Sequence, residues 1–363
     1  MWSRTIAGVL LAVAVHASAQ DGEKLLFDFD AYNPVPSPDG KLIAYDVTGL
    51  TLLPVIGFGR SSLRSQVEFA DVSGKNRRST TFEGFLGEWL PDSSAISTYR
   101  DWRFALASPD GTKQSASMHV VLSDYLPPLA ERATYLPNFG AFVWIEHKDV
   151  GTEIQRTVLQ TNNGPIASLD VLLPLSALIV PSPDQRYLAI GNPGKNLYED
   201  QSLWVFDTEG RTWTNLGSFT IHPDPDWDYI KPSWNPWFSD SGHLAFFSGS
   251  TLYVVSPDGK ERRRVLDAPD AGLAVPSSDG SLIAFLASIP RPRKARPDLN
   301  FWGGSSILVV PSGGGEPVTI TKPSDEETFD LRWLPDNSLV FDRIGEGLFN
   351  EGARIWTVSI ALH

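Results

Sequence analysis

The segment from residue 222 to residue 229 holds the densest set of side chains that could do chemistry. Its polar and aromatic members are His222, Asp224, Asp226, Trp227, Asp228 and Tyr229. Three aspartates at alternate positions could direct carboxylates at one cation, as calcium loops do. The sixth position of such a loop would hold Tyr229 instead of glycine, and the twelfth Asn235 instead of glutamate. The pattern therefore favours an acidic, solvated loop, with calcium as the alternative; beside Trp234, the loop could form a rim for a sugar or a peptide.

A second candidate segment is basic. Arg291, Arg293 and Arg296 alternate with prolines, and Trp302 follows them. Guanidinium groups bind carboxylates through paired hydrogen bonds, so this patch could take a uronic acid or an acidic partner. The alternative interpretation is a proline-rich loop that its charges keep solvated.

Catalytic signatures are mostly missing. The sequence contains no Gly-x-Ser-x-Gly element and no phosphate-binding glycine loop. Its histidines do not pair at metal-ligand spacing, so no metal ligand is assigned and the catalytic residues are unknown. A histidine-bound metal would need residues distant in sequence to converge. A pair of carboxylates for glycoside hydrolysis, such as Asp226 with Glu346, is an alternative that no sequence motif supports.

A repeated turn divides the chain into units that must position these segments. Each copy has a Trp or Pro, then Pro or Ser, then Asp, and a strand start four residues after the Asp. Six copies contain Asp39, Asp92, Asp184, Asp240, Asp279 and Asp336, and a degraded seventh contains Asn138. Pro presets φ, Asp bonds its own backbone and Gly accepts positive φ, so the motif predicts a tight turn between two strands.

The copies lie 39 to 57 residues apart, and a second turn follows in most units. Units of four strands at this spacing predict an all-β propeller. Seven blades fit best, with six or eight as alternatives. The last unit has three strands before the chain ends, so we expect Leu25 to Phe29 to supply the fourth and close the ring.

Composition sets the broad class. The N-terminus has Arg4, an apolar run from Ile6 to Val15 and small residues before Gln20. This pattern predicts a signal peptide over residues 1–19 and therefore a periplasmic or secreted protein. The apolar run is too short to span a membrane, so we expect no membrane span. Together with the repeats, the pattern predicts a single propeller domain over residues 20–363. The chain lacks cysteine, which excludes disulfides and thiolate sites, and its net charge of −13 argues against nucleic acid as a partner. We expect a monomer.

The repeats resemble those of the TolB-like propellers, also called WD40-like, whose consensus runs Trp-Ser-Pro-Asp-Gly and then Ile-Ala-Phe. The matching stretches are Ser37 to Gly40 with Ile43 to Tyr45, Ser182 to Asp184 with Leu188 and Ala189, and Ser278 to Gly280 with Ile283 to Phe285. The resemblance implies the fold but does not fix function, since the family includes envelope proteins, peptidase propellers and sugar-acid lyases. TolB itself has an α/β domain before its propeller. Here the first repeat begins soon after the expected cleavage site, so TolB's partners are not carried over.

In a propeller with strands A to D in each blade, the A–B and C–D turns lie on one face, here called the turn face. The B–C and D–A connections lie on the other, here called the loop face. The long connections of this chain fall almost all on the loop face, where insertions usually mark a binding surface. We therefore expect a non-catalytic scaffold that binds a protein or a glycan there. The alternative is a carbohydrate-active enzyme, a lyase or a hydrolase, with its site on the same face.

Overall fold

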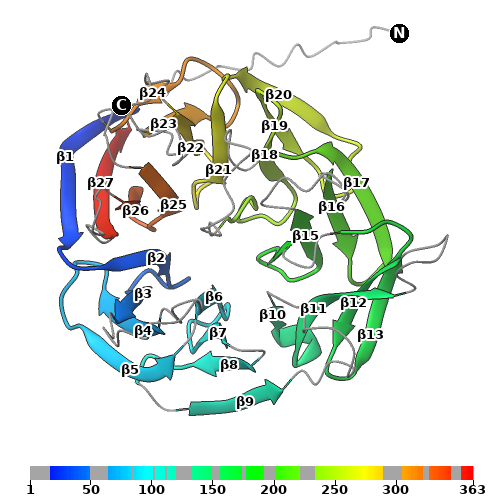
Figure 1. The fold of residues 1–363 in the computed structure, drawn as a ribbon. Coiled ribbons are helices and arrows are strands. Elements are labelled where there is room, and N and C mark those ends of the chain that lie inside the picture. The colour runs from blue at the N-terminus through cyan, green and yellow to red at the C-terminus, as the bar shows by residue number, and fades with distance from the viewer. Residues whose placement is uncertain are drawn as a thin grey trace, which may run out of the picture.

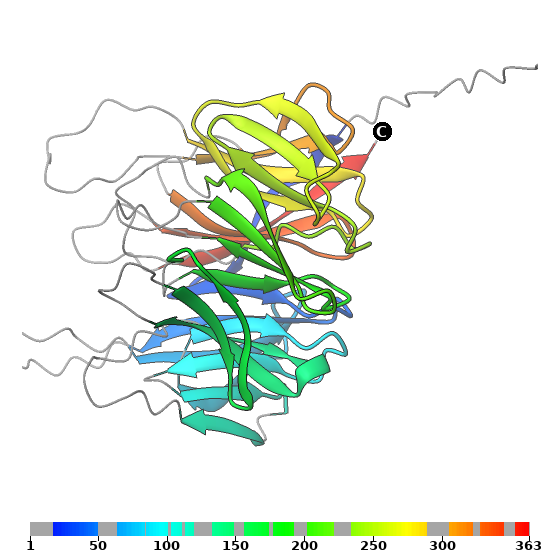
Figure 2. The ribbon, with the colours of Figure 1, turned by 90° about the vertical axis from the view of Figure 1, so that its right-hand side faces the viewer.

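The computed structural model describes residues 17–49, 64–83, 85–100, 103–110, 113–119, 133–148, 156–173, 177–191, 202–220, 234–288, 305–321, 327–344 and 353–362. The strands in these ranges form seven small antiparallel sheets, arranged as a ring around one axis (Figure 1). Figure 2 shows the ring from the side, with the strands running between its two faces. The predicted seven-bladed all-β propeller is confirmed.

The first four blades follow one another along the chain, and in each the A strand lies innermost. Blade 1 contains β2 (Ala31–Pro36), β3 (Leu42–Gly49), β4 (Arg64–Asp71) and β5 (Arg78–Glu83). Blade 2 contains β6 (Phe85–Trp89), β7 (Ile96–Arg100), β8 (Arg103–Ala107) and β9 (Lys113–His119). Blade 3 contains β10 (Ala133–Leu136), the 3-10 turn η1 (Pro137–Phe139), β11 (Ala141–Lys148), β12 (Arg156–Thr161) and β13 (Gly164–Leu169). Blade 4 contains β14 (Leu178–Pro181), β15 (Tyr187–Gly191), β16 (Ser202–Asp207) and β17 (Thr212–Ser218).

Two of the remaining three blades depart from this plan: blade 5 has a sheet of three strands, and blade 7 takes its outer strand from the N-terminal part of the chain. Blade 5 contains β18 (Leu244–Ser248), β19 (Thr251–Val255) and β20 (Arg262–Asp267). Blade 6 contains β21 (Ala271–Pro276), β22 (Leu282–Ser288), β23 (Ser305–Pro311) and β24 (Val318–Thr319). Blade 7 contains β25 (Glu327–Trp333), β26 (Ser338–Ile344), β27 (Arg354–Leu362) and, from the other end of the chain, β1 (Ala17–Phe27).

Proline explains the short inner edge of blade 5. The described residues before β18 pair with it through two isolated bridges, Thr220 with Phe247 and Trp237 with Leu244. Pro236 has no N–H to donate, so only its carbonyl joins the ladder, accepting a hydrogen bond from the Ala245 amide at 2.8 Å.

The ring closes by pairing the two ends of the chain. β1 runs antiparallel to β27, with Glu23 opposite Val358 and Leu25 opposite Trp356 (Figure 1). The expected N-terminal closing strand is thus present, but its predicted bounds, Leu25 to Phe29, were wrong. The strand ends at Phe27, because residues 28–30 form the bend into β2. The first residues of β1 precede the expected cleavage point, whereas Glu23 to Phe27 lie after it and keep their pairing.

The repeated turns connect each blade to the next at the turn face. In three of them a Ser hydroxyl bonds the Asp two residues later, as Ser37 does to Asp39 at 2.7 Å. Ser256 and Asp258 make the same bond in the C–D turn of blade 5. In two turns the residue after the Asp has a positive φ, and its side chain contacts the turn of the preceding blade. Ser93 accepts from the Asp39 amide at 3.0 Å, and Ser241 accepts from the Asp184 amide at 3.0 Å. The turn motif is therefore a contact between blades as well as a local bend.

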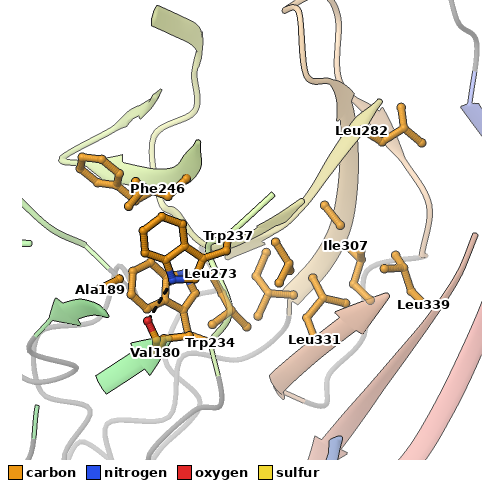
Figure 3. Close-up of a cluster of buried hydrophobic side chains, with 14 of the residues drawn as sticks. Val180, Ala189, Trp234, Trp237, Phe246, Leu273, Leu282, Ile307, Leu331 and Leu339 are labelled. Carbon is orange, nitrogen blue, oxygen red and sulfur yellow. Dashed lines mark hydrogen bonds between the residues drawn. The ribbon is translucent and has the colours of Figure 1, made fainter. Parts of the chain in front are cut away.

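The tryptophans of the motif make a second repeated contact. Their indole N–H donates to a carbonyl of the preceding blade: Trp89 to Val35 at 2.8 Å, Trp237 to Val180 at 2.9 Å, and Trp333 to Val275 at 2.9 Å. Figure 3 shows Trp237 bonded to Val180 and surrounded by apolar side chains. Because a buried indole needs an acceptor, the contact fixes the spacing between blades.

The core lies between the blades. The largest cluster joins blades 4 to 7 and includes Trp234, Phe246, Leu282 and Phe341, while smaller clusters join the other neighbouring pairs. Each sheet thus buries both faces except at its outer strand. Among the described residues, no helix is long and apolar enough to cross a membrane.

Candidate functional site

The ten residues that the sequence nominates lie outside the described residues. They fall in the D–A connection before blade 5 and in the B–C connection of blade 6: His222, Asp224, Asp226, Trp227, Asp228, Tyr229, Arg291, Arg293, Arg296 and Trp302. The structure does describe where these connections attach. Trp234 is buried, and its indole N–H donates to the Ala274 carbonyl at 3.2 Å. Ser305 opens β23. Both attachments belong to adjacent blades on the loop face.

The two histidines whose side chains are described do not converge. His147 lies in β11 of blade 3, where its Nε2 bonds the Leu173 carbonyl. His243 lies in the A–B turn of blade 5, on the turn face. Within the described part of the chain, no group of three or more His, Cys, Asp or Glu side chains is placed to hold a metal ion. His222, and the Asp226 and Glu346 pair considered for glycoside hydrolysis, lie outside it.

A hollow of about 600 Å³ lies on the turn face between blades 5 and 6. His243 stands between two carboxylates there, 3.4 Å from Asp240 and 3.6 Å from Glu261. Arg263, also in the lining, donates to the Ser312 carbonyl at 2.6 Å. Exposed ion pairs of this kind contribute little to stability. The lining carries charges of both signs, from Asp240, Glu261 and Asp279 and from Arg262 and Arg263.

Buried polar chemistry gathers instead on the loop face, where blades 7, 1 and 2 meet. Asp342 of β26 accepts the Asn33 amide of blade 1 at 3.0 Å and the Asp330 amide of its own blade at 2.9 Å. One blade on, Asp46 of β3 accepts the Leu86 amide of blade 2 at 3.3 Å. The two aspartates occupy equivalent strand positions, and each connects its B strand to the next blade. We call Asn33, Asp46, Asp330 and Asp342 the aspartate layer.

Burial raises the pKa of Asp342 well above its ordinary value. The negative charge of Asp330 adds to this effect, while hydrogen bonds from two backbone amides oppose it. Asn33 connects the two halves of the layer, because its side-chain amide donates to Asp46 at 3.1 Å. Its φ of 53° is left-handed, a conformation that asparagine adopts more readily than most residues.

An ion pair spans the inner edge of the same blades. Arg332 of β25 donates to Glu88 of β6 at 2.6 Å, joining blade 7 to blade 2 past blade 1. The Arg332 side chain is 6% exposed and that of Glu88 is 26% exposed. The inner strands here thus present a charged pair where blades 4 to 6 present apolar side chains.

Sequence reasoning missed the aspartate layer. The stretches Ile43 to Asp46 and Leu339 to Asp342 share a pattern of two aliphatic or small residues, then an aromatic residue, then Asp. Counting four residues from the Asp of each turn does not align them. In blade 1 the turn closes from the Ser37 amide to the Leu42 carbonyl, whereas in blade 7 it closes from the Leu334 amide to the Ser338 carbonyl, one residue shorter. The residue of β26 that matches Ile43 of β3 is therefore Leu339, one residue before the predicted Val340.

Seven sheets closed by the N-terminal strand make this chain a seven-bladed β-propeller. Among solved structures it is similar to an oligogalacturonate lyase in complex with manganese, with a TM-score of 0.59, 12% identity, and 96% of each chain covered. It is similar to an oligogalacturonate lyase from Vibrio parahaemolyticus, with a TM-score of 0.59 and 13% identity over 96% of this chain and 97% of that one. It is also similar to the propeller domain of the Trilobed protease from Pyrococcus furiosus, with a TM-score of 0.51 and 13% identity over 92% and 97%.

These likenesses establish a shared fold, because identities this low carry no activity with them. No family model matches the sequence, and no curated protein matches it either. Membership of the TolB-like family therefore remains a prediction from the repeats.

Proposed function

We propose that this protein is an exported propeller that binds a protein or a glycan through its loop face. The observation that carries the proposal is the uneven length of the connections. On the loop face β3 ends at Gly49 and β4 begins at Arg64, and β22 ends at Ser288 before β23 begins at Ser305. On the turn face a single hydrogen-bonded turn joins most A and B strands. Binding residues are disproportionately found on loops that a rigid scaffold positions.

The composition of the long connections supports a ligand with polar and ring-shaped parts. Trp227 and Tyr229 lie among the acidic residues of one connection, and Trp302 follows the arginines of another. Flat aromatic rings with nearby charges suit sugars and peptides alike. Export to the periplasm or the medium belongs to the same proposal and rests on the N-terminal pattern.

The test uses the mature chain from Gln20. Its binding is measured to the glycans of an array and to proteins from the cell envelope or the culture medium. We expect the double change Trp227→Ala and Trp302→Ala to weaken binding of the captured ligand at least about tenfold, which corresponds to about 1.4 kcal/mol. The control is Asp258→Ala on the turn face, which should bind as the unchanged protein does. Equal binding by the double variant and the control would refute the proposal.

A carbohydrate-active enzyme is the second candidate, and Asp342 is the observation that favours it. A carboxyl group with a raised pKa beside a second carboxyl group is what a general acid needs. Binding ranks first because Asp342 is 1% exposed and already accepts two backbone amides. Product release from polyuronides and oligosaccharides, abolished by Asp342→Asn, would establish an enzyme that uses Asp342, and loss on Asp226→Asn would point to the connection before blade 5 instead. Binding of these glycans without turnover would exclude them as substrates.

A further inference from the structure

In the part of the chain that the structure describes, three buried polar groups of blade 7 have atoms without a hydrogen-bond partner. The first is Arg343 of β26, whose side chain is 4% exposed and whose Nε and Nη2 have no partner. The others are the indole nitrogen of Trp356 in β27 and the hydroxyl of Thr328 in β25. Buried polar groups of folded proteins are nearly always bonded, so three together indicate that something else supplies the acceptor.

The three groups share one side of the sheet. Thr328 pairs directly with Arg343, and Phe341 pairs directly with Trp356. Directly paired residues point to the same face, as do Phe341 and Arg343, two apart on one strand. The Arg343 guanidinium lies 4.9 Å from the Phe341 ring centre and 5.6 Å from that of Trp356.

This side of blade 7 faces blade 6. Phe341 belongs to the same core cluster as Ile307 of β23, and the Thr328 amide donates to the Ser305 hydroxyl at 3.0 Å. Thr328 lies near the start of β25, Arg343 near the end of β26 and Ser305 at the start of β23. All three positions are at the loop face, where the proposed function places the ligand.

The free atoms of Arg343 define the kind of acceptor. Its Nη1 is occupied, because it donates to Glu23 of the closing strand. Nε and Nη2 form the parallel fork of a guanidinium, the edge that holds both oxygens of one carboxylate. Arginine does not lose its proton in proteins, so the fork cannot relieve its desolvation by becoming neutral.

We propose that Arg343, with Trp356 and Thr328, forms a carboxylate-binding subsite between blades 6 and 7. The proposal rests on the proposed function and names the chemistry of its ligand: a carboxylate group whose two oxygens face the Arg343 fork, with the Trp356 indole as a further donor. The carboxylate could belong to a uronic acid or to an acidic amino acid, and the experiment distinguishes them.

The test is calorimetric titration of the mature protein with galacturonate, glutamate and acetate at constant ionic strength, with galactose as the neutral match for galacturonate. We expect carboxylates to bind and galactose not to. Arg343→Lys keeps the charge but loses the fork, so it should weaken carboxylate binding at least about tenfold. Trp356→Phe keeps the ring but removes one donor, so it should weaken binding about two- to tenfold. Tighter binding of galacturonate than glutamate would assign the uronic acid, and the reverse the acidic amino acid.

The control is Arg354→Lys. Arg354 pairs with Arg343 across the strands but is 38% exposed and already bonded to Asp28, so this variant should bind as the unchanged protein does. Equal binding by sulfate or chloride, no carboxylate binding, or carboxylate binding unchanged in Arg343→Lys would each overturn the proposal. If Arg343→Lys does not fold, unchanged binding in Trp356→Phe overturns it. A ligand whose capture depends on Trp227 and Trp302 but not on Arg343 would leave the proposed function standing without this subsite.

Discussion

The two faces of the propeller use polar residues in opposite ways. On the turn face the same contacts recur from blade to blade, with a Ser bonded to an Asp within a turn and a neighbouring residue bonded to the Asp amide. On the loop face the polar residues differ from blade to blade. Asp46 and Asp342 occupy a position that holds Phe247 in blade 5 and Leu286 in blade 6. The repeated hydrogen bonds of the turn face hold neighbouring blades together, whereas the polar residues that differ between blades lie toward the loop face, where the long connections are.

The largest expected effect is on the contacts that repeat. Trp237→Ala should lower the free energy of unfolding by about 3–5 kcal/mol, because it empties a site in the main core. Trp237→Phe should cost about 1–3 kcal/mol, because it removes the indole hydrogen bond to the Val180 carbonyl. Denaturant unfolding measures both. Trp213→Phe is the control, since the Trp213 indole nitrogen is buried without a partner in the structure and its loss should cost little. Equal costs for the two Phe variants would show that the contact between blades contributes nothing.

The turns on the same face give the next effect. Gly40 has a φ of +68°, and a Cβ there would overlap the Pro335 ring of blade 7. Gly40→Ala should therefore cost about 2–4 kcal/mol, from backbone strain and overpacking together. Gly140→Ala is the matched control, because Gly140, in the A–B turn of blade 3, has a φ of +56° but nothing within 4 Å of an added Cβ. It should cost only the strain, about 1–2 kcal/mol. If thermal melting finds the two variants alike, the close approach of blades 7 and 1 is unimportant.

The faces should also differ in their response to pH. The pKa of Asp342 is higher in the folded protein than in the unfolded chain. Between these two pKa values the folded state binds more protons, so the free energy of unfolding falls as pH rises from the ordinary carboxyl pKa to the raised one. Asp330→Asn removes the repelling charge and should flatten this fall. Hydrogen bonds from Lys41 and Ser37 lower the pKa of Asp39 to about 2, so its contribution is present above pH 4 and is lost as pH drops toward 2. Melting temperatures from pH 2 to 8 test both, and an unchanged slope in Asp330→Asn would contradict the coupling.

The smallest expected effect on stability is that of the loop-face candidates. Changing Trp227 and Trp302 to Ala should alter the free energy of unfolding by no more than about 0.5 kcal/mol, as for surface positions in general. The same double variant should lose ligand binding, whereas Asp258→Ala on the turn face should keep it. A large loss of stability in the double variant would mean that these residues belong to the scaffold.

The sequence by itself determined the seven units, their turns and the closing strand. These features are local: proline and glycine set φ, aspartate bonds its own backbone, and alternating apolar residues follow the strand period. Even the degraded seventh copy, with Asn138 in η1, was found from its offsets. The sequence also placed the long connections on one face, since strand order alone decides that.

Only the tertiary structure decided which polar residues meet. Asp342 and Asn33 are bonded although they lie at opposite ends of the chain, because ring closure brings blade 7 against blade 1. The one-residue difference between the turns of blades 7 and 1 decides that Asp342 matches Asp46, and no offset counted along the chain reveals it. Likewise, ring closure brings Glu23 of β1 to the Nη1 of Arg343, a contact between residues at opposite ends of the chain. Hydrogen-bond partners across blades depend on register and burial, which packing sets after the local turns have formed.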